Sequence, residues 1–588
     1  MLGARSGPSW TTRWAPAWRV ALLCGLLLLL APAAADAAGN PPGQPAPISA
    51  PPGTPTLVTS LITPPAGFHL TGKQVLAAAK RNATYIAEMQ KHPHLVAYVY
   101  TRGVGTWQVS LFTPPPKHQY EMLQLYVDDS DDQVTQVWTG FQVAWTMARG
   151  YPGAFGKKIN SLYIWIPLCL AFFLPFFPWR RRPTLWHLDL LVLLAYSVSL
   201  AFFNNANIGL SAPLIYPGML YLLGRMLLLA AGRGRPREPL RMVIPVPWLA
   251  IMLVFLVGFR VGLNVTNSNV IDVGYAGVIG ADKLVHGQPL YGNWPSDNPS
   301  GDTYGPVNYI AYVPFYKIWG WSGVWDNLPA AHAAAIAFDL LTLLGLFVLG
   351  WTIRGPTTGT VLAYLWAAFP FTTYVLSSNS NDALVALMVV VCLLAIRTAA
   401  TRGLMGGLAG LTKFAPLALG PLLLRGVGPR PQRRSIVIFA AAYALALVLP
   451  MLPVFISHDW HWFWTDSISY QANRPAPFSI WGLWGGFDQS LKIPQRIVLG
   501  CGALLALGAG FWPRGNRTMV EVAALGATII IVLQCSISYW FYLYIVWFFP
   551  LVIVALVLAH PASPAEAERD KLSVKWSEPA SALSPVSP

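Results

Sequence analysis

Residues 264–315 read NVTNSNVIDVGYAGVIGADKLVHGQPLYGNWPSDNPSGDTYGPVNYIAYVPF. This polar segment lies between long hydrophobic stretches. Its first carboxylate, Asp272, comes shortly after an apolar run that ends near Leu263. The segment continues through the turn sequence Gly287–Tyr291 and ends with Tyr304-Gly305-Pro306 followed by an aromatic stretch. The pattern predicts an acidic group held at the end of a membrane helix, beside turns that present aromatic rings.

The composition is that of a membrane protein with many spans. Hydrophobic residues make up 55% of the 588 residues, charged residues 11%, and the mean hydropathy is +0.48. A soluble domain carries about 25% charged residues. The net charge of +15 comes from arginines beside apolar runs, which is the positive-inside pattern and argues against nucleic-acid binding. The cysteines all lie in apolar runs, so disulfides and metal sites are not expected.

Apolar stretches of the length that crosses a bilayer, about 20 residues, predict about eleven spans. They lie near residues 161–178, 184–203, 209–231, 243–263, 329–352, 357–377, 383–399, 435–456, 495–512, 519–535 and 537–559. The basic runs predict which loops are cytoplasmic, and the loop 264–328 then lies outside. The orientations alternate if residues 403–424, which contain Lys413, form a broken hairpin that enters and leaves on the cytoplasmic side.

The regions outside the spans have distinct compositions. Residues 1–37 resemble a signal peptide, with an uncleaved anchor as the alternative. Residues 38–66 are rich in Pro, Gly and Ala and predict a disordered linker. Residues 67–157 predict a small exported α+β domain. Residues 158–242 supply additional transmembrane helices before a core of residues 243–560, and residues 561–588 predict a disordered cytoplasmic tail.

Periodicity within the exported domain predicts one helix over residues 71–91 and strands over 95–101, 106–112, 124–127 and 134–139. The acidic cluster Asp128–Asp132 could hold Ca²⁺, but it lacks the glycine and distal glutamate of an EF-hand, and a solvated turn is the alternative. The stretches TWQVSLF and LYVDDSDDQVTQV resemble a PepSY-type domain. That resemblance implies a binding or regulatory module rather than a catalytic one.

Asp272 is suited to act as a general base. Sugar transfer from a lipid phosphate needs a base for the attacking hydroxyl, but no general acid, because the phosphate leaves as a stable anion. A glycosidase, in contrast, needs two carboxylates. The alternative role for Asp272 is a helix N-cap. The aromatic residues of Val307–Trp321 are typical of a membrane interface, where a polyprenyl donor would lie.

Several motifs in this order resemble GT-C glycosyltransferases, and most of all glycosyltransferase family 87 and related actinobacterial mannosyltransferases. The family's first external loop is similar to Asp272-x-x-Tyr275, Gly287–Tyr291, Tyr304–Pro306 and Pro314-Phe315, and later motifs are similar to Ser380–Leu384, Gly410–Pro416 and Arg474–Trp481. The resemblance covers roughly residues 243–559. It implies a GT-C-type helical core, a polyprenyl-phosphate-linked sugar as donor, and Asp272 as the catalytic residue. The exported domain and the spans of residues 158–242 depart from the family pattern.

Other polar residues of the predicted core are candidates for substrate binding: Tyr275, His286, Tyr291, Tyr304, Asp382, Arg474 and Arg260. Arg474 is the preferred partner for the leaving phosphate, because a guanidinium matches phosphate geometry, and a surface salt bridge is its alternative. Asp382 either contacts a substrate or caps a helix. We expect Asp272, Tyr304, Asp382 and Arg474 to line one cavity that opens outward and sideways into the bilayer.

Four further acids belong to the predicted core. Asp339 lies inside a span, where it is either functional or paired with a basic group such as Lys413. Asp282, Asp297 and Asp302 are only loosely spaced, so no metal site is predicted. The chain has no P-loop, no dinucleotide-binding glycine motif and no His/Cys metal spacing, and no cofactor is expected.

The sequence therefore predicts an inverting membrane glycosyltransferase in the cell membrane, with its exported domain and active site outside the cytoplasm. The donor would be a polyprenyl-phosphate sugar, with mannose favoured. The acceptor would be an envelope glycolipid, a glycan or an exported protein. One alternative is a transporter or flippase for a lipid-linked precursor, although the internal repeat typical of transporters is not found. Another is a membrane sensor whose exported domain binds a ligand.

Overall fold

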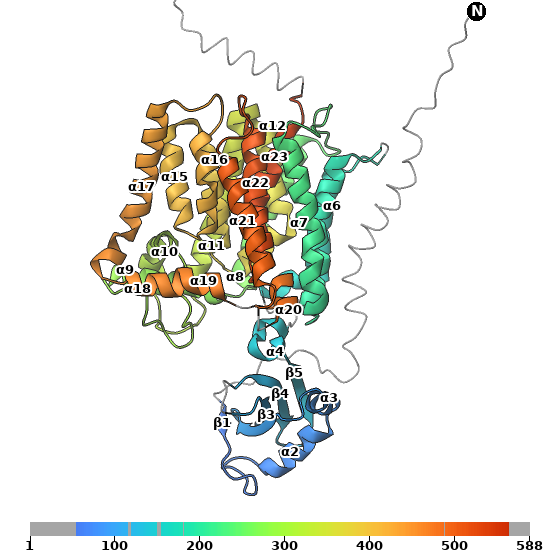
Figure 1. The fold of residues 1–588 in the computed structure, drawn as a ribbon. Coiled ribbons are helices and arrows are strands. Elements are labelled where there is room, and N and C mark those ends of the chain that lie inside the picture. The colour runs from blue at the N-terminus through green and yellow to red at the C-terminus, as the bar shows by residue number, and fades with distance from the viewer. Residues whose placement is uncertain are drawn as a thin grey trace, which may run out of the picture.

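The computed structural model describes residues 55–115, 119–149, 155–179, 182–474, 476–486 and 489–563. The predicted signal peptide, most of the predicted linker and most of the predicted tail lie outside these residues. The described chain forms a helical bundle, with a small α+β domain beyond one of its ends (Figure 1).

The α+β domain is an antiparallel meander with two helices packed against the sheet. Its strands follow the order β1-β2-β3-β4-β5, and its elements are β1 Thr56–Leu57, α2 Gly72–Arg81, α3 Ala83–Lys91, β2 Val96–Thr101, β3 Thr106–Phe112, β4 Glu121–Asp128 and β5 Val134–Thr139. Alternate residues of β3 and β4, among them Trp107, Val109 and Leu125, form a core with Val75 and Ala79 of α2. The strand pattern predicted from alternation is therefore present, with β4 longer than expected.

Two features of this domain differ from the sequence prediction. The single helix expected over residues 71–91 is divided at Asn82, whose side chain accepts hydrogen bonds from the Thr84 and Tyr85 amides and so starts a second helix. The folded region also begins before residue 67. Thr56 and Leu57, placed in the disordered linker by their composition, pair with Thr101 and Tyr100 of β2.

Within the acidic cluster, Asp129 is a buried structural acceptor. Its carboxylate accepts hydrogen bonds from Trp107 Nε1 at 2.7 Å, from the His69 amide at 2.7 Å and from the Leu70 amide at 3.0 Å. The neighbouring Ser130 and Asp131 are exposed. The cluster thus ties the segment before α2 to the sheet, and the solvated-turn interpretation holds only for its outer part.

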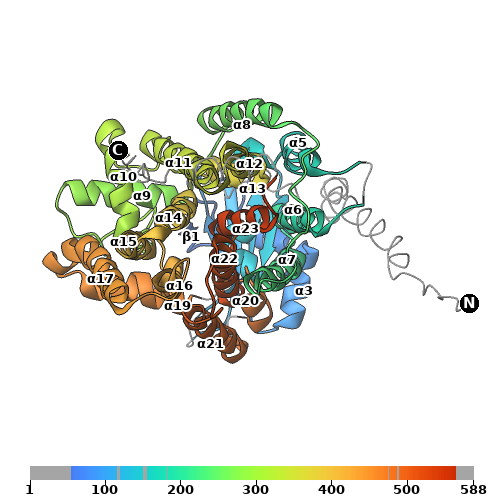
Figure 2. The ribbon, with the colours of Figure 1, turned by 90° about the horizontal axis from the view of Figure 1, so that it is seen from above.

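The bundle contains the α-helices from α5 onward: α5 Leu162–Phe173, α6 Leu185–Asn204, α7 Ile208–Ala230, α8 Val246–Thr266, α9 Asp272–Val285, α10 Pro306–Trp319, α11 Pro329–Arg354, α12 Pro356–Ala368, α13 Pro370–Ser377, α14 Asp382–Leu394, α15 Ala399–Gly410, α16 Gly420–Arg425, α17 Arg433–Ile456, α18 Trp460–Trp462, α19 Tyr470–Asn473, α20 Ile480–Gly485, α21 Lys492–Gly508, α22 Met519–Ser536 and α23 Ile545–Ala559. The short helix α4, Phe141–Ala144, lies between the α+β domain and the bundle (Figure 1). Viewed along the bundle, α22 and α23 lie in its middle (Figure 2). The apolar window that contains α23 is 94% buried, as expected for a helix that is hydrophobic on all sides.

The predicted count of eleven spans is wrong for this structure. In the described chain, seven helices are long and apolar enough to cross a membrane, or eight if α12 and α13 together form one bent span. The bend between those two helices is 59°, at Pro370, where proline cannot continue the hydrogen-bond ladder. Three helices that lie within predicted spans are too short to cross the hydrocarbon core of a membrane. Helix α5 has 12 residues, α14 has 13 and α21 has 17.

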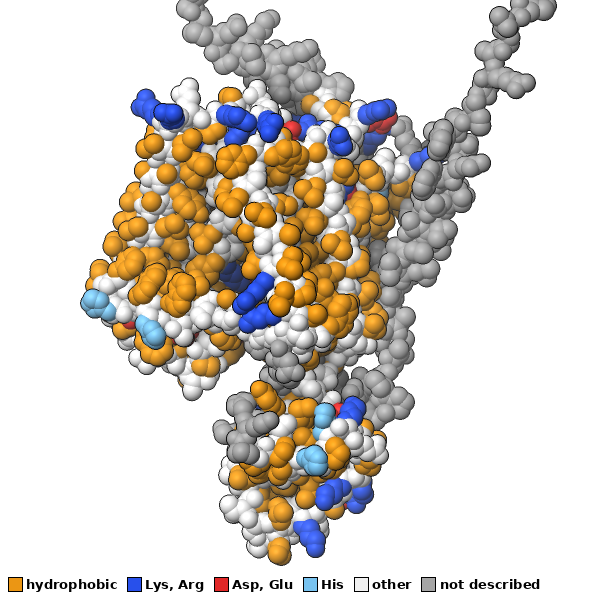
Figure 3. Space-filling view, in the orientation of Figure 1, with side chains coloured by type: hydrophobic (Ala, Val, Ile, Leu, Met, Phe, Trp, Pro, Cys, Tyr) orange, Lys and Arg blue, Asp and Glu red, His pale blue; other side chains and the backbone are white. Residues whose placement is uncertain are grey.

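Charged side chains are distributed unevenly over the bundle. In the view of Figure 3, lysine and arginine side chains gather at the end of the bundle away from the α+β domain, and hydrophobic side chains cover the surface between the two ends. Exposed apolar residues of the bundle helices include Val254, Phe255 and Val437. Such a belt is expected where lipid, rather than water, contacts the protein.

Candidate functional site

A cavity of about 50 Å³ lies at the end of the bundle nearest the α+β domain. We call it the Asp272 cavity. It is lined by Phe155, Ile271, Asp272, Val273, Tyr304, Asp382, Lys413, Gln471, Arg474, Tyr539, Phe541, Leu543 and Tyr544. Asp272, Tyr304, Asp382 and Arg474, the four residues expected to share a cavity, are all among them.

Asp272 is the first residue of α9, and its position is fixed by the backbone before it. The Asn269 and Ile271 amides donate to the carbonyls of Ser377 and Ser378 at 3.0 and 3.2 Å. Ile271 is the N-cap and makes no side-chain capping bond, so Asp272 is not the N-cap considered from the sequence. Its side chain is exposed to the cavity, which leaves the carboxylate available to a substrate.

A close approach between two segments holds α9 in this place. A Cβ atom added to Gly274 would lie 2.1 Å from the carbonyl oxygen of Asn379. Only glycine therefore allows α9 to pack this closely against the turn before α14. That turn leads directly into Asp382, so the same contact brings two of the cavity's carboxylates together.

A second backbone pairing positions Tyr304. The amides of Gly305 and Val307 donate to the carbonyls of Thr412 and Leu411 at 3.3 and 3.1 Å. Tyr304 is thereby placed beside Lys413, whose ammonium lies 5.2 Å from the centre of the tyrosine ring. The turn that follows α15 in the predicted broken hairpin thus contributes directly to the site.

Lys413 and Asp382 form a buried ion pair. Lys413 Nζ lies 2.5 Å from Asp382 Oδ1, and the same oxygen accepts a hydrogen bond from Trp547 Nε1 at 2.8 Å. Asp382 Oδ2 is buried and has no hydrogen-bond partner among the described residues. The ammonium also lies 5.5 Å from the ring centre of Tyr544 and 5.2 Å from that of Trp547, positions that favour a cation.

Arg474 provides the second cation of the cavity. Its guanidinium lies 3.7 Å from the ring centre of Tyr539, 5.3 Å from that of Tyr470 and 5.0 Å from that of Trp145. Arg474 Nε is buried and has no hydrogen-bond partner within the described ranges. The surface salt bridge considered as an alternative is not formed with any described residue. Trp145 belongs to the segment that leaves the α+β domain, so that segment contacts the cavity's arginine.

The electrostatic environment of Asp272 combines opposing effects. Burial in the protein raises the pKa of the Asp272 carboxyl above its ordinary value, while the Val273 amide and the charges of Arg474 and Lys413 act in the opposite direction. The carboxylate is reachable from the cavity although it lies deep among protein atoms. A carboxylate with an elevated pKa binds a proton more strongly than an ordinary aspartate does.

Four of the predicted substrate-binding residues lie outside the cavity lining. Tyr275 is buried and donates to Asp297 Oδ2 at 3.2 Å. His286 is exposed beside Asp282. Tyr291 is buried and donates to the Tyr304 carbonyl at 2.8 Å, so it supports the cavity wall indirectly. None of these three side chains lines the Asp272 cavity.

Arg260, the fourth of these residues, pairs with Asp339 inside the bundle. Their closest atoms, Arg260 Nη2 and Asp339 Oδ1, are 2.8 Å apart, and each side chain is 1% exposed. The suggested pairing of Asp339 with Lys413 is therefore wrong, because each has a different buried partner. A span that carries a carboxylate needs a counter-charge within reach, and α8 supplies it.

Metal-binding geometry is absent from the described part of the chain, where no group of three or more His, Cys, Asp or Glu side chains could hold an ion. The three loop acids have separate partners. Tyr316 donates to Asp282, Tyr275 to Asp297, and the Gly292 amide to Asp302.

Sequence reasoning missed several residues of the cavity. Lys413 was expected in an irregular hairpin or as a partner of Asp339, not in the cavity, yet its ammonium is a central charge of the site. Tyr539 and Tyr544 lie in the aromatic sequence SYWFYLY, residues 538–544, which was assigned to a predicted span. The density of tyrosines in that short stretch was the available signal, because hydroxyl-bearing rings are unusual in the middle of a bilayer.

The comparisons with known proteins give no relative. No protein-family model, no curated protein and no solved structure matches the chain.

Proposed function

We propose that the chain is an inverting glycosyltransferase of the membrane, which moves a sugar from a polyprenyl phosphate to a hydroxyl of an envelope acceptor. The observation that carries the proposal is the meeting of one accessible carboxylate, Asp272, with two cations, Lys413 and Arg474, in one cavity. This set matches a reaction that needs one base and a stabilised phosphate leaving group. The motifs that resemble GT-C enzymes add independent support and favour mannose.

In the proposed reaction, the acceptor hydroxyl oxygen attacks the anomeric carbon while its proton passes to the Asp272 carboxylate. The bond between the anomeric carbon and the phosphate oxygen breaks, and its electron pair leaves with the phosphate. Arg474, whose Nε lacks a described partner, and Lys413 would stabilise the resulting charge. No general acid is required.

The location of the cavity favours a lipid-linked donor. Basic side chains gather at the far end of the bundle (Figure 3), and the positive-inside rule would place that end in the cytoplasm. The cavity and the α+β domain would then lie outside, where nucleotide sugars are lacking. Trp460, Trp462 and Trp464, each half or more exposed, lie before the segment that carries Arg474, where they could anchor it at the membrane interface.

A donor sugar requires this cavity to widen. A volume of about 50 Å³ holds roughly four water molecules, which is less than a hexose occupies. The wall that contains Gln471 and Arg474 follows a π-helix, Phe463–Ser469, and π-helical turns are frequent at functional sites because they disturb the regular hydrogen-bond ladder. Displacement of this wall would admit the sugar and leave Asp272 in place on α9.

The test is sugar transfer by purified full-length protein supplied with radiolabelled polyprenyl-phosphate mannose and envelope lipid extract. Asp272→Asn should lower the rate about 10²- to 10⁴-fold, the usual contribution of a general base, at a normal protein level. Asp297→Asn, a change of the same chemistry in the same loop but outside the cavity lining, should retain most activity. Turnover that survives Asp272→Asn would contradict the proposal.

The same assay separates the alternatives. A transporter would move the labelled lipid between leaflets without forming a new glycoside. A sensor would lose its function on deletion of residues 39–157 and keep it in Asp272→Asn.

A further inference from the structure

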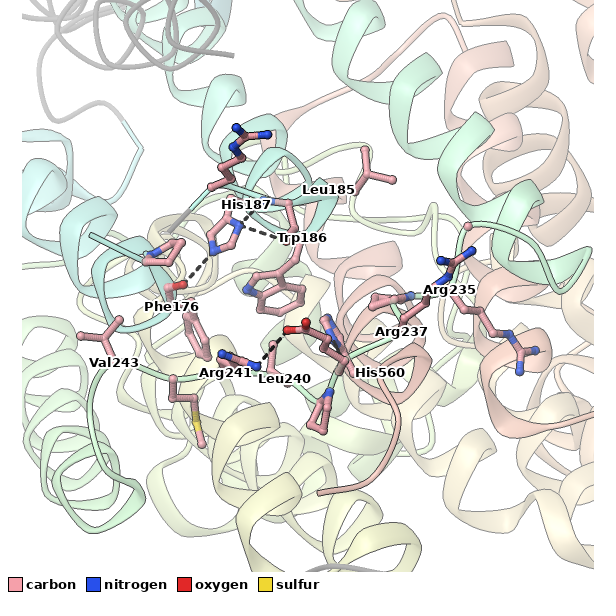
Figure 4. Close-up of a pocket in the computed structure, with 18 of the residues that line it drawn as sticks. Phe176, Leu185, Trp186, His187, Arg235, Arg237, Leu240, Arg241, Val243 and His560 are labelled. Atoms are coloured by element: carbon pink, nitrogen blue, oxygen red, sulfur yellow. Dashed lines mark hydrogen bonds and ion pairs between the residues drawn. The ribbon is translucent and has the colours of Figure 1, made fainter. Parts of the chain in front are cut away.

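A second cavity, of about 770 Å³, lies at the other end of the bundle (Figure 4). We call it the arginine pocket. Its walls come from the start of α6, the loop between α7 and α8, and His560 after α23. The opposite ends of α6 and α7 face the α+β domain, where Gln142 Nε2 donates to the Ala206 carbonyl at 3.0 Å. The pocket and the Asp272 cavity are therefore separate sites.

Specific hydrogen bonds hold the walls of this pocket in place. His187 Nδ1 accepts from the Thr184 amide at 2.9 Å, and its Nε2 lies 2.8 Å from the Phe176 carbonyl, which fixes the start of α6. Arg225 donates to the Gly234 carbonyl at 2.9 Å. His560 Nδ1 lies 3.0 Å from the Glu238 carbonyl. The loop between α7 and α8 is thus tied to the bundle at two points.

The lining carries a positive charge that its acids do not balance. The arginines are Arg182, Arg225, Arg235, Arg237 and Arg241, and Glu238 is the only acid of the lining. Three of these arginines are paired: Arg225 with Asp189, Arg235 with Glu521 and Arg241 with Glu238. The remaining two, Arg182 and Arg237, form no ion pair with a described residue and are exposed. An anion in the pocket would meet two uncompensated guanidinium groups.

The rest of the lining is apolar and aromatic. Trp179, Leu185, Trp186 and Met242 contribute to it. The indole Nε1 of Trp186 is buried and has no hydrogen-bond partner among the described residues, and the whole side chain is only 3% exposed.

We propose that the arginine pocket binds an anionic membrane lipid, with its phosphate at Arg182 and Arg237 and its chains against Trp186, Leu185 and Met242. Guanidinium groups match phosphate oxygens in geometry and charge. The apolar lining and the position at the basic end of the bundle distinguish a lipid from a free anion, because an inorganic ion would leave the apolar walls uncovered. This inference does not depend on the chemistry of the Asp272 cavity.

The experiment is native mass spectrometry of the full-length protein in detergent, titrated with dioleoyl-phosphatidylglycerol, dioleoyl-phosphatidylcholine or inorganic phosphate. The double variant Arg182→Gln/Arg237→Gln removes the unpaired charges, and Val243→Trp fills the pocket. The control Arg433→Gln/Arg434→Gln removes the same charge from exposed residues at the start of α17. That helix lies across the bundle from α6 (Figure 2).

The expected result is preferential binding of the phosphatidylglycerol. The dissociation constant should rise about 25-fold in the double variant, since each arginine near an anionic lipid contributes about a fivefold factor. It should also rise in Val243→Trp and stay unchanged in the control. Equal weakening by the control would mean general charge attraction, and equal binding of phosphatidylcholine or of inorganic phosphate would exclude an anionic-lipid site. Each of these results would overturn the proposal.

Discussion

Lys413 Nζ lies 2.5 Å from Asp382 Oδ1, although the two residues are 31 positions apart in the chain. The contact joins the turn after α15 to the first residue of α14. Both side chains are at least nine-tenths buried, so each charge depends on the other for compensation. Because Trp547 also donates to Asp382, the pair connects the hairpin, α14 and the central helix α23 in one network next to Asp272.

Removal of one member of this pair should be strongly destabilising. Lys413→Met leaves the Asp382 carboxylate buried without a counter-charge, and the free energy of unfolding should fall by about 3–5 kcal/mol. The double variant Lys413→Met/Asp382→Leu should recover much of that loss but not sugar transfer, because the cavity still lacks its ammonium. Unfolding in mixed micelles and the transfer assay measure the two effects. A Lys413→Met variant as stable as the native protein would show that Asp382 does not depend on Lys413 for charge compensation.

The pH dependence of transfer should follow the ionisation of Asp272. Only the carboxylate can accept a proton, so activity should fall as the pH drops through a pKa that lies above the ordinary aspartate value of about 4. Arg474 lowers this pKa by its charge. The variant Arg474→Gln should therefore move the acid limb of the rate profile to higher pH, in addition to lowering the maximal rate. An acid limb that stays in place would show that Asp272 is not the titrating group.

Gly274→Ala should disturb the site through packing alone. The new Cβ would meet the Asn379 carbonyl oxygen at 2.1 Å, which cannot be relieved by a side-chain rotation. We expect a loss of about 1–3 kcal/mol in stability and reduced transfer, because α9 must move and Asp272 moves with it. Gly262→Ala in α8 is the matched control, since nothing lies within 4 Å of its added Cβ. Thermal unfolding and the transfer rate should both be lowered in Gly274→Ala and unchanged in Gly262→Ala.

Trp145→Ala tests whether the segment leaving the α+β domain acts on the cavity. The indole lies 5.0 Å from the Arg474 guanidinium and also contacts the rings of Phe478 and Tyr539. Its loss should remove about 0.5–2 kcal/mol of cation–π attraction, loosen Arg474 and lower kcat/KM severalfold. Trp351→Ala, an exposed tryptophan of α11, should leave the kinetics unchanged. If Trp145→Ala and the native protein had equal kinetics, the segment leaving the α+β domain would have no influence on the reaction at the Asp272 cavity.

The local pattern of the chain predicted its local structure well. Strands β3 and β5 begin and end where the alternation of apolar residues indicated, because a half-buried strand shows its periodicity directly. The span count was too high for an equally physical reason. Apolar length reports burial in either lipid or protein, and α14, with Asp382 fully buried at its start, lies within the bundle rather than crossing as a full-length span.

The lining of the Asp272 cavity was predicted in part. Asp272, Tyr304, Asp382 and Arg474 stand in motifs whose order could be read from the sequence, and they line one cavity. Tyr275 and His286 stand in the same loop and lie elsewhere. A loop sequence shows that a residue is polar and near a turn, but it does not show which way the side chain points.

The sequence by itself determined the hydrophobic class of the protein, the strands of its α+β domain and the presence of an acidic loop after α8, because these depend on composition and on spacing within short segments. Tertiary structure alone decided that Lys413 pairs with Asp382, that Arg260 pairs with Asp339, and that Trp145 reaches Arg474. Each of these contacts joins segments far apart in the chain. Buried charges must find a partner wherever the packing of the helices places one, and spacing along the chain carries no record of that packing.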